Sequence, residues 1–173
     1  ELIMKSSDLH SLTVEVSGYC NAKCPHCPRY TDDGYLHNYI PETHLLPDIF
    51  NGIDKSKLSN LKTVYLTGAT GDPLMNPHVE SLIENFNFVP SIVLDTNGGI
   101  RDIKWWKDFA RFKNLQVMWA VDGLKDTNHL YRIGVDFDKV QRNMEAFISA
   151  GGNAVWKFIV FKHNQHQIDK VKA

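Results

Sequence analysis

Residues 20–27 read Cys-Asn-Ala-Lys-Cys-Pro-His-Cys, and this stretch holds all three cysteines of the 173-residue chain. The spacing is C-x3-C-x2-C, so three thiolates on one short loop can face a single inorganic centre. A cubane iron–sulfur cluster normally takes four cysteine ligands, and three would leave one iron with an open position. An open position is what separates a catalytic metal site from a structural one. Cys20, Cys24 and Cys27 are therefore candidate ligands of a reactive metal centre.

Other interpretations of the cysteine loop compete with a cluster. A zinc site could use the three cysteines plus His26, but zinc modules usually present two ligand pairs a dozen or more residues apart. This sequence has no second pair. An odd number of cysteines in one loop disfavours a disulfide framework. Inert buried cysteines are disfavoured by Lys23, Pro25 and Pro28, which indicate an irregular loop. The cluster is the favoured interpretation, and zinc and inert cysteines remain the alternatives.

The composition limits the class of protein. A chain of this length forms one domain with a sizeable core, and 43% apolar with 23% charged residues is typical of a soluble globular protein. The formal net charge of -1 gives no electrostatic footprint for nucleic acid or a membrane surface. No apolar run has the length of a membrane span, and residues 1–8 lack the features of a signal peptide. Because clustered free cysteines fit a reducing compartment, we expect a cytoplasmic protein without nucleic-acid or membrane partners.

The apolar pattern alternates between strand-like and helix-like segments along the chain. Short β-branched or apolar runs predict strands at residues 12–16, 64–67, 92–96, 117–121 and 155–161. Apolar residues at helical spacing lie between them, in residues 79–86, 105–112 and 137–148. Asn164 is expected to cap a last helix that runs to Ala173. This order of β-α units predicts an α/β fold with a parallel sheet and right-handed crossovers.

The predicted strands run into loops of unusual composition. The first ends directly before the cysteine loop, the second opens into Gly68-Ala69-Thr70-Gly71-Asp72-Pro73, and the third ends in Thr96-Asn97-Gly98. Ligands of α/β sheets bind beyond the carboxyl ends of the strands, and glycines let the backbone approach a ligand closely. An ordinary strand-to-helix turn has the same composition, so neither glycine-rich loop identifies a ligand on its own.

Taken together, these motifs resemble the radical S-adenosylmethionine (radical SAM) superfamily over residues 14–168. In that family, three cysteines hold a [4Fe-4S] cluster and the amino acid end of SAM chelates the fourth iron. Gly71-Asp72-Pro73 resembles the second family motif, usually Gly-Gly-Glu-Pro, and His26 stands where an aromatic residue is usual. The segments Val121-Asp122-Gly123 and Tyr131-Arg132 look like the branch that often carries a C-terminal cluster-binding (SPASM) extension.

The resemblance implies a role for each matching residue. Cys20, Cys24 and Cys27 would ligate the cluster. Gly68, Gly71 and Asp72 would hold the methionine ammonium of SAM, because an ammonium group needs carbonyl and carboxylate acceptors. The remaining cofactor contacts would be His26, Thr96 and Asn97 near the cofactor, Asp122 at the ribose, Arg132 at the SAM carboxylate, and Val160 and Phe161 at the adenine. An ordinary salt bridge is the alternative role of Arg132.

The resemblance also implies the fold. Known radical SAM cores are partial barrels of six β/α units, and about five units are predicted in this sequence. Residues 1–173 are therefore expected to form a single core domain, an incomplete (partial) parallel β/α barrel. The sixth unit and any C-terminal auxiliary domain are expected to be missing.

The reaction that the resemblance implies is reductive cleavage of SAM. The reduced cluster gives one electron to the sulfonium, and the 5′-deoxyadenosyl radical that forms takes a hydrogen atom from the substrate. An electron donor such as a flavodoxin or ferredoxin would act as partner, and the SPASM-like segments favour a peptide or protein substrate. The competing function is a non-catalytic metal-binding or electron-transfer module that holds either an iron–sulfur cluster or zinc.

Overall fold

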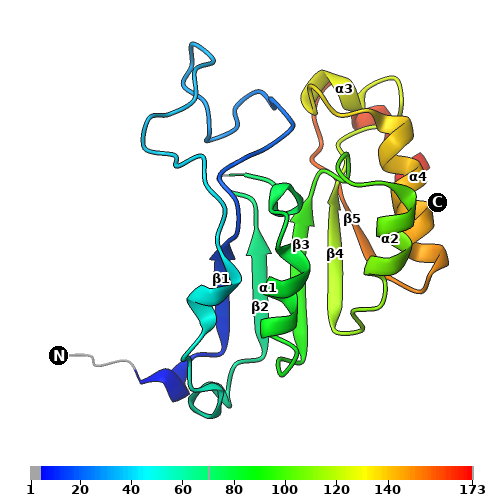
Figure 1. Cartoon of the computed structure of the whole chain (residues 1–173). Coiled ribbons are helices and arrows are strands. Elements are labelled where there is room, and N and C mark those ends of the chain that lie inside the picture. The colour runs from blue at the N-terminus through cyan, green and yellow to red at the C-terminus, as the bar shows by residue number, and fades with distance from the viewer. Residues whose placement is uncertain (1–4, 70, 173) are drawn as a thin grey trace.

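The computed structural model describes residues 5–69 and 71–172, and its core is one open sheet (Figure 1). Within that part of the chain the sheet has five parallel strands in the order β1-β2-β3-β4-β5. The strands are β1 (Ser11–Glu15), β2 (Thr63–Thr67), β3 (Ser91–Thr96), β4 (Leu115–Ala120) and β5 (Asn153–Lys157). Each crossover therefore moves one place along the sheet, as in an unrolled β/α barrel. The predicted α/β fold with a parallel sheet is confirmed.

Helices cover one face of the sheet, where Figure 1 shows α1, α2 and α4 packed in sequence order. The helices are α1 (Val79–Asn85), α2 (Ile103–Phe109), α3 (Asn128–Tyr131), α4 (Phe137–Ser149) and α5 (Ile168–Lys172). Trp106 of α2 is fully buried, with its ring centroid 4.3 Å from that of Trp119 in β4. Large aromatic side chains like these dominate the burial energy of a core. Among the described residues, no helix is long and apolar enough to cross a membrane.

The two faces of each strand differ, because successive side chains point to opposite sides. In β2, Val64 and Leu66 are fully buried beneath the helices, whereas Tyr65 between them is 38% exposed. Asp95 of β3 and Lys157 of β5 also remain partly exposed. The face opposite the helices is therefore only partly covered, and polar side chains lie on it near the carboxyl ends of the strands.

The last strand is shorter than its sequence predicts. The apolar run predicts a strand over residues 155–161, but β5 ends at Lys157. Beyond it, two side chains replace the strand ladder as hydrogen-bond acceptors: the Ile159 N–H donates to Asp122 Oδ1 (2.6 Å) and the Phe161 N–H donates to Asn164 Oδ1 (2.6 Å). Side-chain acceptors compete with regular structure in this way; here Asn164 is local and Asp122 follows β4. The prediction for residues 158–161 is therefore wrong.

Asn164 also differs from its predicted role as a helix cap. Its side-chain Nδ2 donates to the carbonyl oxygens of Asp122 (2.7 Å) and Ile159 (2.9 Å). It makes no side-chain bond to the short 3-10 helix Gln165–Gln167 that follows. Asn164 therefore holds the end of β4 against the segment after β5. Ala173, the predicted end of the last helix, lies outside the described residues.

Candidate metal and cofactor site

The cysteine loop lies beyond the carboxyl end of β1, at the same edge of the sheet where β2 and β3 end (Figure 1). All three cysteines are free thiols. They line one cavity of about 420 Å³ together with residues from the ends of the other strands and from α3. This volume lies within the range of small-molecule and cofactor sites. The topology therefore brings the two loop motifs of the sequence into one cavity.

Backbone contacts hold the cysteine loop in place without any metal. The Lys23 N–H donates to the carbonyl oxygen of Ile133 (2.9 Å), which ties the loop to the segment after α3. On the other side, the Asp72 N–H donates to the carbonyl oxygen of Tyr19 (2.7 Å). His26 takes a left-handed backbone conformation with φ of 58°, which turns the chain between the second and third cysteines. The loop is therefore held at its start, Tyr19, by the loop after β2 and at its middle, Lys23, by the segment after α3.

Nitrogen donors face two of the cysteine sulfurs. Cys20 Sγ accepts from the Ala22 N–H (3.4 Å) and from Asn97 Nδ2 (3.9 Å). Cys24 Sγ accepts from Arg132 Nη1 (3.7 Å). Hydrogen bonds to cysteine sulfur are among the features that tune iron–sulfur clusters. The site thus already carries donors suited to thiolate ligands.

Burial raises the pKa of two of the three cysteine thiols. It raises the pKa of Cys20 to about 11, and the charge of Asp72 adds to the rise. Burial also raises the pKa of Cys24, although the guanidinium of Arg132 opposes the rise. A metal centre supplies the positive charge that deprotonates its thiol ligands. Binding a metal here would therefore release protons.

A single ion and a cluster differ in how closely they require the three thiols to converge. Within residues 5–69 and 71–172, no group of three His, Cys, Asp or Glu side chains surrounds one point as a bound ion requires. Zinc needs its ligands within about 2.0–2.3 Å of one centre, whereas each cysteine of a cubane cluster binds a separate iron. His26 is also not among the residues that line the cavity. The geometry therefore disfavours the zinc alternative with His26 as fourth ligand.

Gly71 permits a close approach between two loops. A Cβ atom on Gly71 would collide with the carbonyl oxygen of Ser17 and would lie 2.6 Å from that of Tyr19. Similarly, a Cβ on Gly68 would collide with the carbonyl oxygen of Gly71. The sequence predicts that these glycines allow the backbone to approach a ligand closely. In the structure, Gly71 instead allows the loop after β2 to pack against the start of the cysteine loop. A role of either glycine in holding the methionine ammonium stays a prediction.

Asp72 is buried, only 4% exposed, and its carboxylate accepts hydrogen bonds from its own loop and from the end of β3. Its Oδ1 accepts from the Leu74 N–H (3.0 Å) and from the Thr96 hydroxyl (2.9 Å). Its Oδ2 accepts from the Asn97 N–H (2.9 Å). Burial raises the pKa of Asp72, and the Asn97 and Leu74 N–H donors and the Thr96 hydroxyl oppose the rise. The carboxylate therefore joins the loop after β2 to the end of β3, and its predicted contact with the SAM ammonium stays a prediction.

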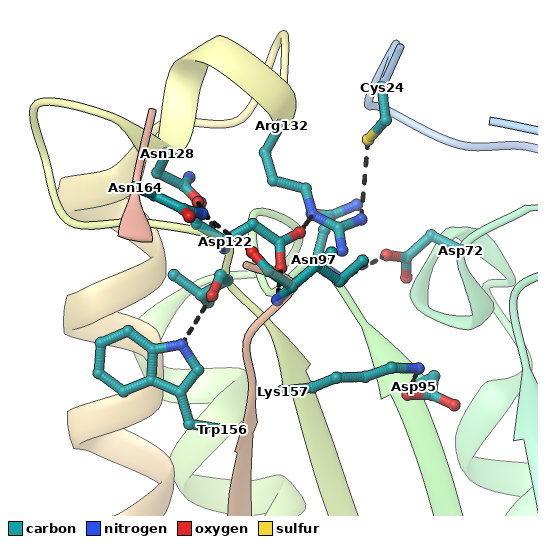
Figure 2. A network of polar contacts seen from close by, with 12 residues as sticks. Cys24, Asp72, Asp95, Asn97, Asp122, Asn128, Arg132, Trp156, Lys157 and Asn164 are labelled. Carbon is teal, nitrogen blue, oxygen red and sulfur yellow. Dashed lines mark hydrogen bonds and ion pairs between the residues drawn. The ribbon is translucent and has the colours of Figure 1, made fainter. Parts of the chain in front are cut away.

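Arg132 forms the opposite wall of the cavity. Its Nε donates to Asp122 Oδ2 at 2.6 Å, and Figure 2 shows the guanidinium lying between this carboxylate and Cys24. The Arg132 side chain is 15% exposed and the Asp122 side chain is fully buried. Arg132 therefore makes a buried salt bridge and still reaches the cavity. Its predicted contact with the SAM carboxylate and the contact of Asp122 with the ribose stay predictions.

The structure brings most of the predicted site residues together. Those that line the cavity are Cys20, Cys24, Cys27, Gly68, Gly71, Asp72, Thr96, Asn97 and Arg132. Those that do not line it are His26, Asp122, Val160 and Phe161. Asp122 is nevertheless linked to the cavity through Arg132, and the ring of Phe161 packs on Tyr131, with ring centroids 4.5 Å apart.

Several residues that line the cavity are not predicted from the sequence. Asp95 and Lys157 form an ion pair across β4, with Lys157 Nζ 3.3 Å from Asp95 Oδ1. Both lie at the carboxyl ends of strands, on the face opposite the helices. The alternation of side chains along each strand could therefore have predicted that they face the cavity. Arg29 lines the cavity next to the cysteines and donates to the carbonyl oxygen of Gly18. No pattern in the sequence distinguishes Arg29 from a surface arginine.

The fold and the site together define a class of protein: a parallel β/α sheet with three free cysteines in a cavity at its carboxyl edge. The family model for the radical SAM superfamily matches residues 14–171, and the chain belongs to this family. Members of the family use a [4Fe-4S] cluster and SAM. A comparison with curated proteins finds no match.

Solved structures share the fold. The structure of anSMEcpe with bound AdoMet and Cp18Cys peptide is 24% identical, with a TM-score of 0.69 over 94% of this chain and 46% of that one. Streptococcus suis SuiB bound to precursor peptide SuiA is 17% identical, with a TM-score of 0.73 over 95% and 36%. BtrN in complex with AdoMet and 2-DOIA is 14% identical, with a TM-score of 0.63 over 87% and 56%. The chain thus spans about half or less of the length of the first two proteins.

Replacing Gly71 by alanine tests the contact between the two loops. The added methyl group forces the cysteine loop away from the loop after β2, and overpacking of this kind costs about 1–3 kcal/mol. We expect Gly71→Ala to lower both the urea midpoint and the iron content after reconstitution. The control is Gly34→Ala, because a Cβ there meets nothing within 4 Å and the substitution adds only the strain of a φ of 81°. Full iron content in Gly71→Ala would contradict the predicted role of this close approach.

Proposed function

We propose that this chain is the catalytic core of a radical SAM enzyme. The observation that carries the proposal is that three free thiols and the two strand-end motifs line one cavity in a member of this family. A [4Fe-4S] cluster with SAM supplies one-electron cleavage of a carbon–sulfur bond and a carbon-centred radical that abstracts hydrogen. The residues of this chain supply binding, orientation and exclusion of water.

Each part of the cavity has a task in this proposal. Cys20, Cys24 and Cys27 ligate the cluster and leave one iron for SAM. Asp72 and the carbonyl groups of its loop orient the methionine ammonium, and the strand-end residues Thr96 and Asn97 close the cavity behind it. These groups are held by hydrogen bonds within the chain, so they need little reorganisation when the cofactor binds.

The proposed substrate is a peptide or protein. The support is the SPASM-like sequence segments and the similarity in fold to anSMEcpe, solved with a peptide, and to SuiB, solved with its precursor peptide. BtrN, solved with 2-DOIA, shows that the same fold accommodates a small molecule in another protein. The proposed electron donor is a flavodoxin or ferredoxin, and the proposed location is the cytoplasm, where thiols stay reduced.

Anaerobic reconstitution with iron and sulfide tests this function. We expect about four iron and four sulfide per chain, and formation of methionine and 5′-deoxyadenosine when dithionite and SAM are added. Protein that has not been reconstituted is the control. One zinc per chain without sulfide would contradict the proposal. A cluster that forms but never cleaves SAM would instead identify an electron-transfer module.

A further inference from the structure

Arg132 is a charged group that contacts a cysteine sulfur. Its Nη1 lies 3.7 Å from Cys24 Sγ, and its Nε donates to Asp122 Oδ2 at 2.6 Å. The donors to Cys20 Sγ are the neutral amides of Ala22 and Asn97. The charge of Arg29 also acts on the Cys20 thiol. The two thiols therefore differ in their hydrogen-bond donors, and a charged donor makes a stronger hydrogen bond than a neutral one.

Asp122 fixes the position of Arg132, and each polar atom of Asp122 makes a hydrogen bond (Figure 2). The Asp122 N–H donates to Asn128 Oδ1 (3.0 Å), and the Asp122 carbonyl oxygen accepts from Asn164 Nδ2 (2.7 Å). The second carboxylate oxygen accepts from the Ile159 N–H (2.6 Å). Asp122 is thus unable to turn away from Arg132 without losing several bonds between buried groups.

The cysteine loop is fixed toward Arg132 by a separate contact. The Lys23 N–H donates to the carbonyl oxygen of Ile133, the residue that follows Arg132. The guanidinium also lies over the Tyr131 ring, 5.3 Å from its centroid. Both partners of the contact between Arg132 and Cys24 are therefore held by bonds that do not depend on it.

This geometry has an electrostatic consequence for a cluster bound to Cys24. The pair of Asp122 and Arg132 is neutral as a whole, but its positive end points at the sulfur and its negative end is buried on the far side. One-electron reduction adds a negative charge to the cluster, and hydrogen bonds to the sulfurs together with local charge set the reduction potential. A fixed positive donor stabilises the reduced form more than the oxidised form.

We propose that Arg132 is a positioning residue that raises the reduction potential of the cluster through its contact with Cys24 Sγ, and that Asp122 holds it there. The inference rests on the proposed function, because it requires a cluster at the cysteine loop. The step concerned is a one-electron reduction in which an external donor, dithionite in the test, loses the electron and the cluster gains it. No covalent bond forms or breaks, and no proton moves.

Redox titration of the reconstituted protein, followed by electron paramagnetic resonance without SAM, tests the inference. Arg132→Gln removes the charge, and Arg132→Lys keeps it but loses the planar fork that reaches both partners. At the midpoint potential of the wild type, we expect the ratio of reduced to oxidised cluster in Arg132→Gln to fall at least tenfold. That fall corresponds to 59 mV for a one-electron couple. The potential of Arg132→Lys should lie between those of the other two proteins.

The matched control is Lys157→Gln, which removes one positive charge from the lining of the same cavity. Lys157 Nζ reaches Asp95 Oδ1 at 3.3 Å instead of a sulfur, and its side chain is 50% exposed and screened by water. We expect a shift of less than threefold in the same ratio for this variant. An equal shift in Lys157→Gln and Arg132→Gln would overturn the inference, because it would show a general charge effect.

Cluster content separates this inference from the proposed function. If the wild type holds no iron and sulfide, the proposed function itself fails. If it holds a cluster and Arg132→Gln holds one of unchanged potential, Arg132 has only a structural role and the inference fails alone. If Arg132→Gln does not retain a cluster, the comparison of the wild type with Arg132→Lys decides, and equal potentials in those two proteins overturn the inference.

Discussion

Replacing Cys20, Cys24 or Cys27 singly by alanine is expected to abolish stable cluster binding and, with it, all SAM cleavage. Each thiolate would ligate its own iron, so the loss of one exposes a second iron to solvent and to further loss. The fold should survive, because the loop is held by the backbone bonds from Lys23 and Asp72 and not by its thiols. Iron counting after anaerobic reconstitution measures the effect, and circular dichroism checks the fold.

His26→Asn is the matched control for the cysteine variants. His26 belongs to the same loop but is not among the residues that line the cavity. Asparagine tolerates the left-handed backbone that His26 adopts at φ 58°, so the turn should be kept. We expect the full iron content in this variant. Metal loss in His26→Asn equal to that in the cysteine variants would support the zinc site and contradict the cluster.

The strands were predictable because a local pattern and burial agree in them. Val64 and Leu66 alternate with the exposed Tyr65 as a half-covered strand requires. In residues 158–161 the same local preference fails, because the Asp122 and Asn164 side chains capture the N–H groups that a ladder would need. Strand propensity depends only on the residues of the segment itself. The hydrogen bond from the Ile159 N–H depends on Asp122, which follows β4 and is distant in the sequence.

Topology predicts part of the cavity lining, namely the cysteine loop and the loops after β2 and β3, but it does not predict the partners of these side chains. A parallel sheet brings its strand ends to one edge, and that rule places the cysteine loop beside Asp72 and Thr96. The pairing of Arg132 with Asp122 depends on the short helix α3, which has no apolar repeat long enough to be recognised. Gly71 likewise contacts Ser17, a residue that no sequence pattern connects with it.

Asp72→Ala is expected to weaken both the fold and SAM binding. The substitution leaves the Leu74 N–H, the Asn97 N–H and the Thr96 hydroxyl without their acceptor, and each buried donor left unsatisfied costs roughly 1–3 kcal/mol. The loss of a charge-assisted bond to the SAM ammonium would cost roughly 1.5–3 kcal/mol, or about tenfold to a hundredfold in affinity. Urea unfolding and calorimetry of SAM binding to the reconstituted protein measure the two effects separately.

Two further variants distinguish a direct contact of Asp72 with SAM from an effect through the loops. Asp72→Asn keeps one acceptor oxygen but removes the charge, and its NH2 group must face either the Leu74 or the Asn97 N–H, so it should lose part of the stability and most of the SAM affinity. Thr96→Val removes the hydroxyl donor to Asp72 and leaves the carboxylate charged. It should therefore lower the free energy of unfolding with little change in SAM affinity. If Thr96→Val weakens SAM binding as much as Asp72→Asn does, the carboxylate acts by bracing the end of β3 against the loop after β2, and the ammonium must find its acceptors among the backbone carbonyls of that loop.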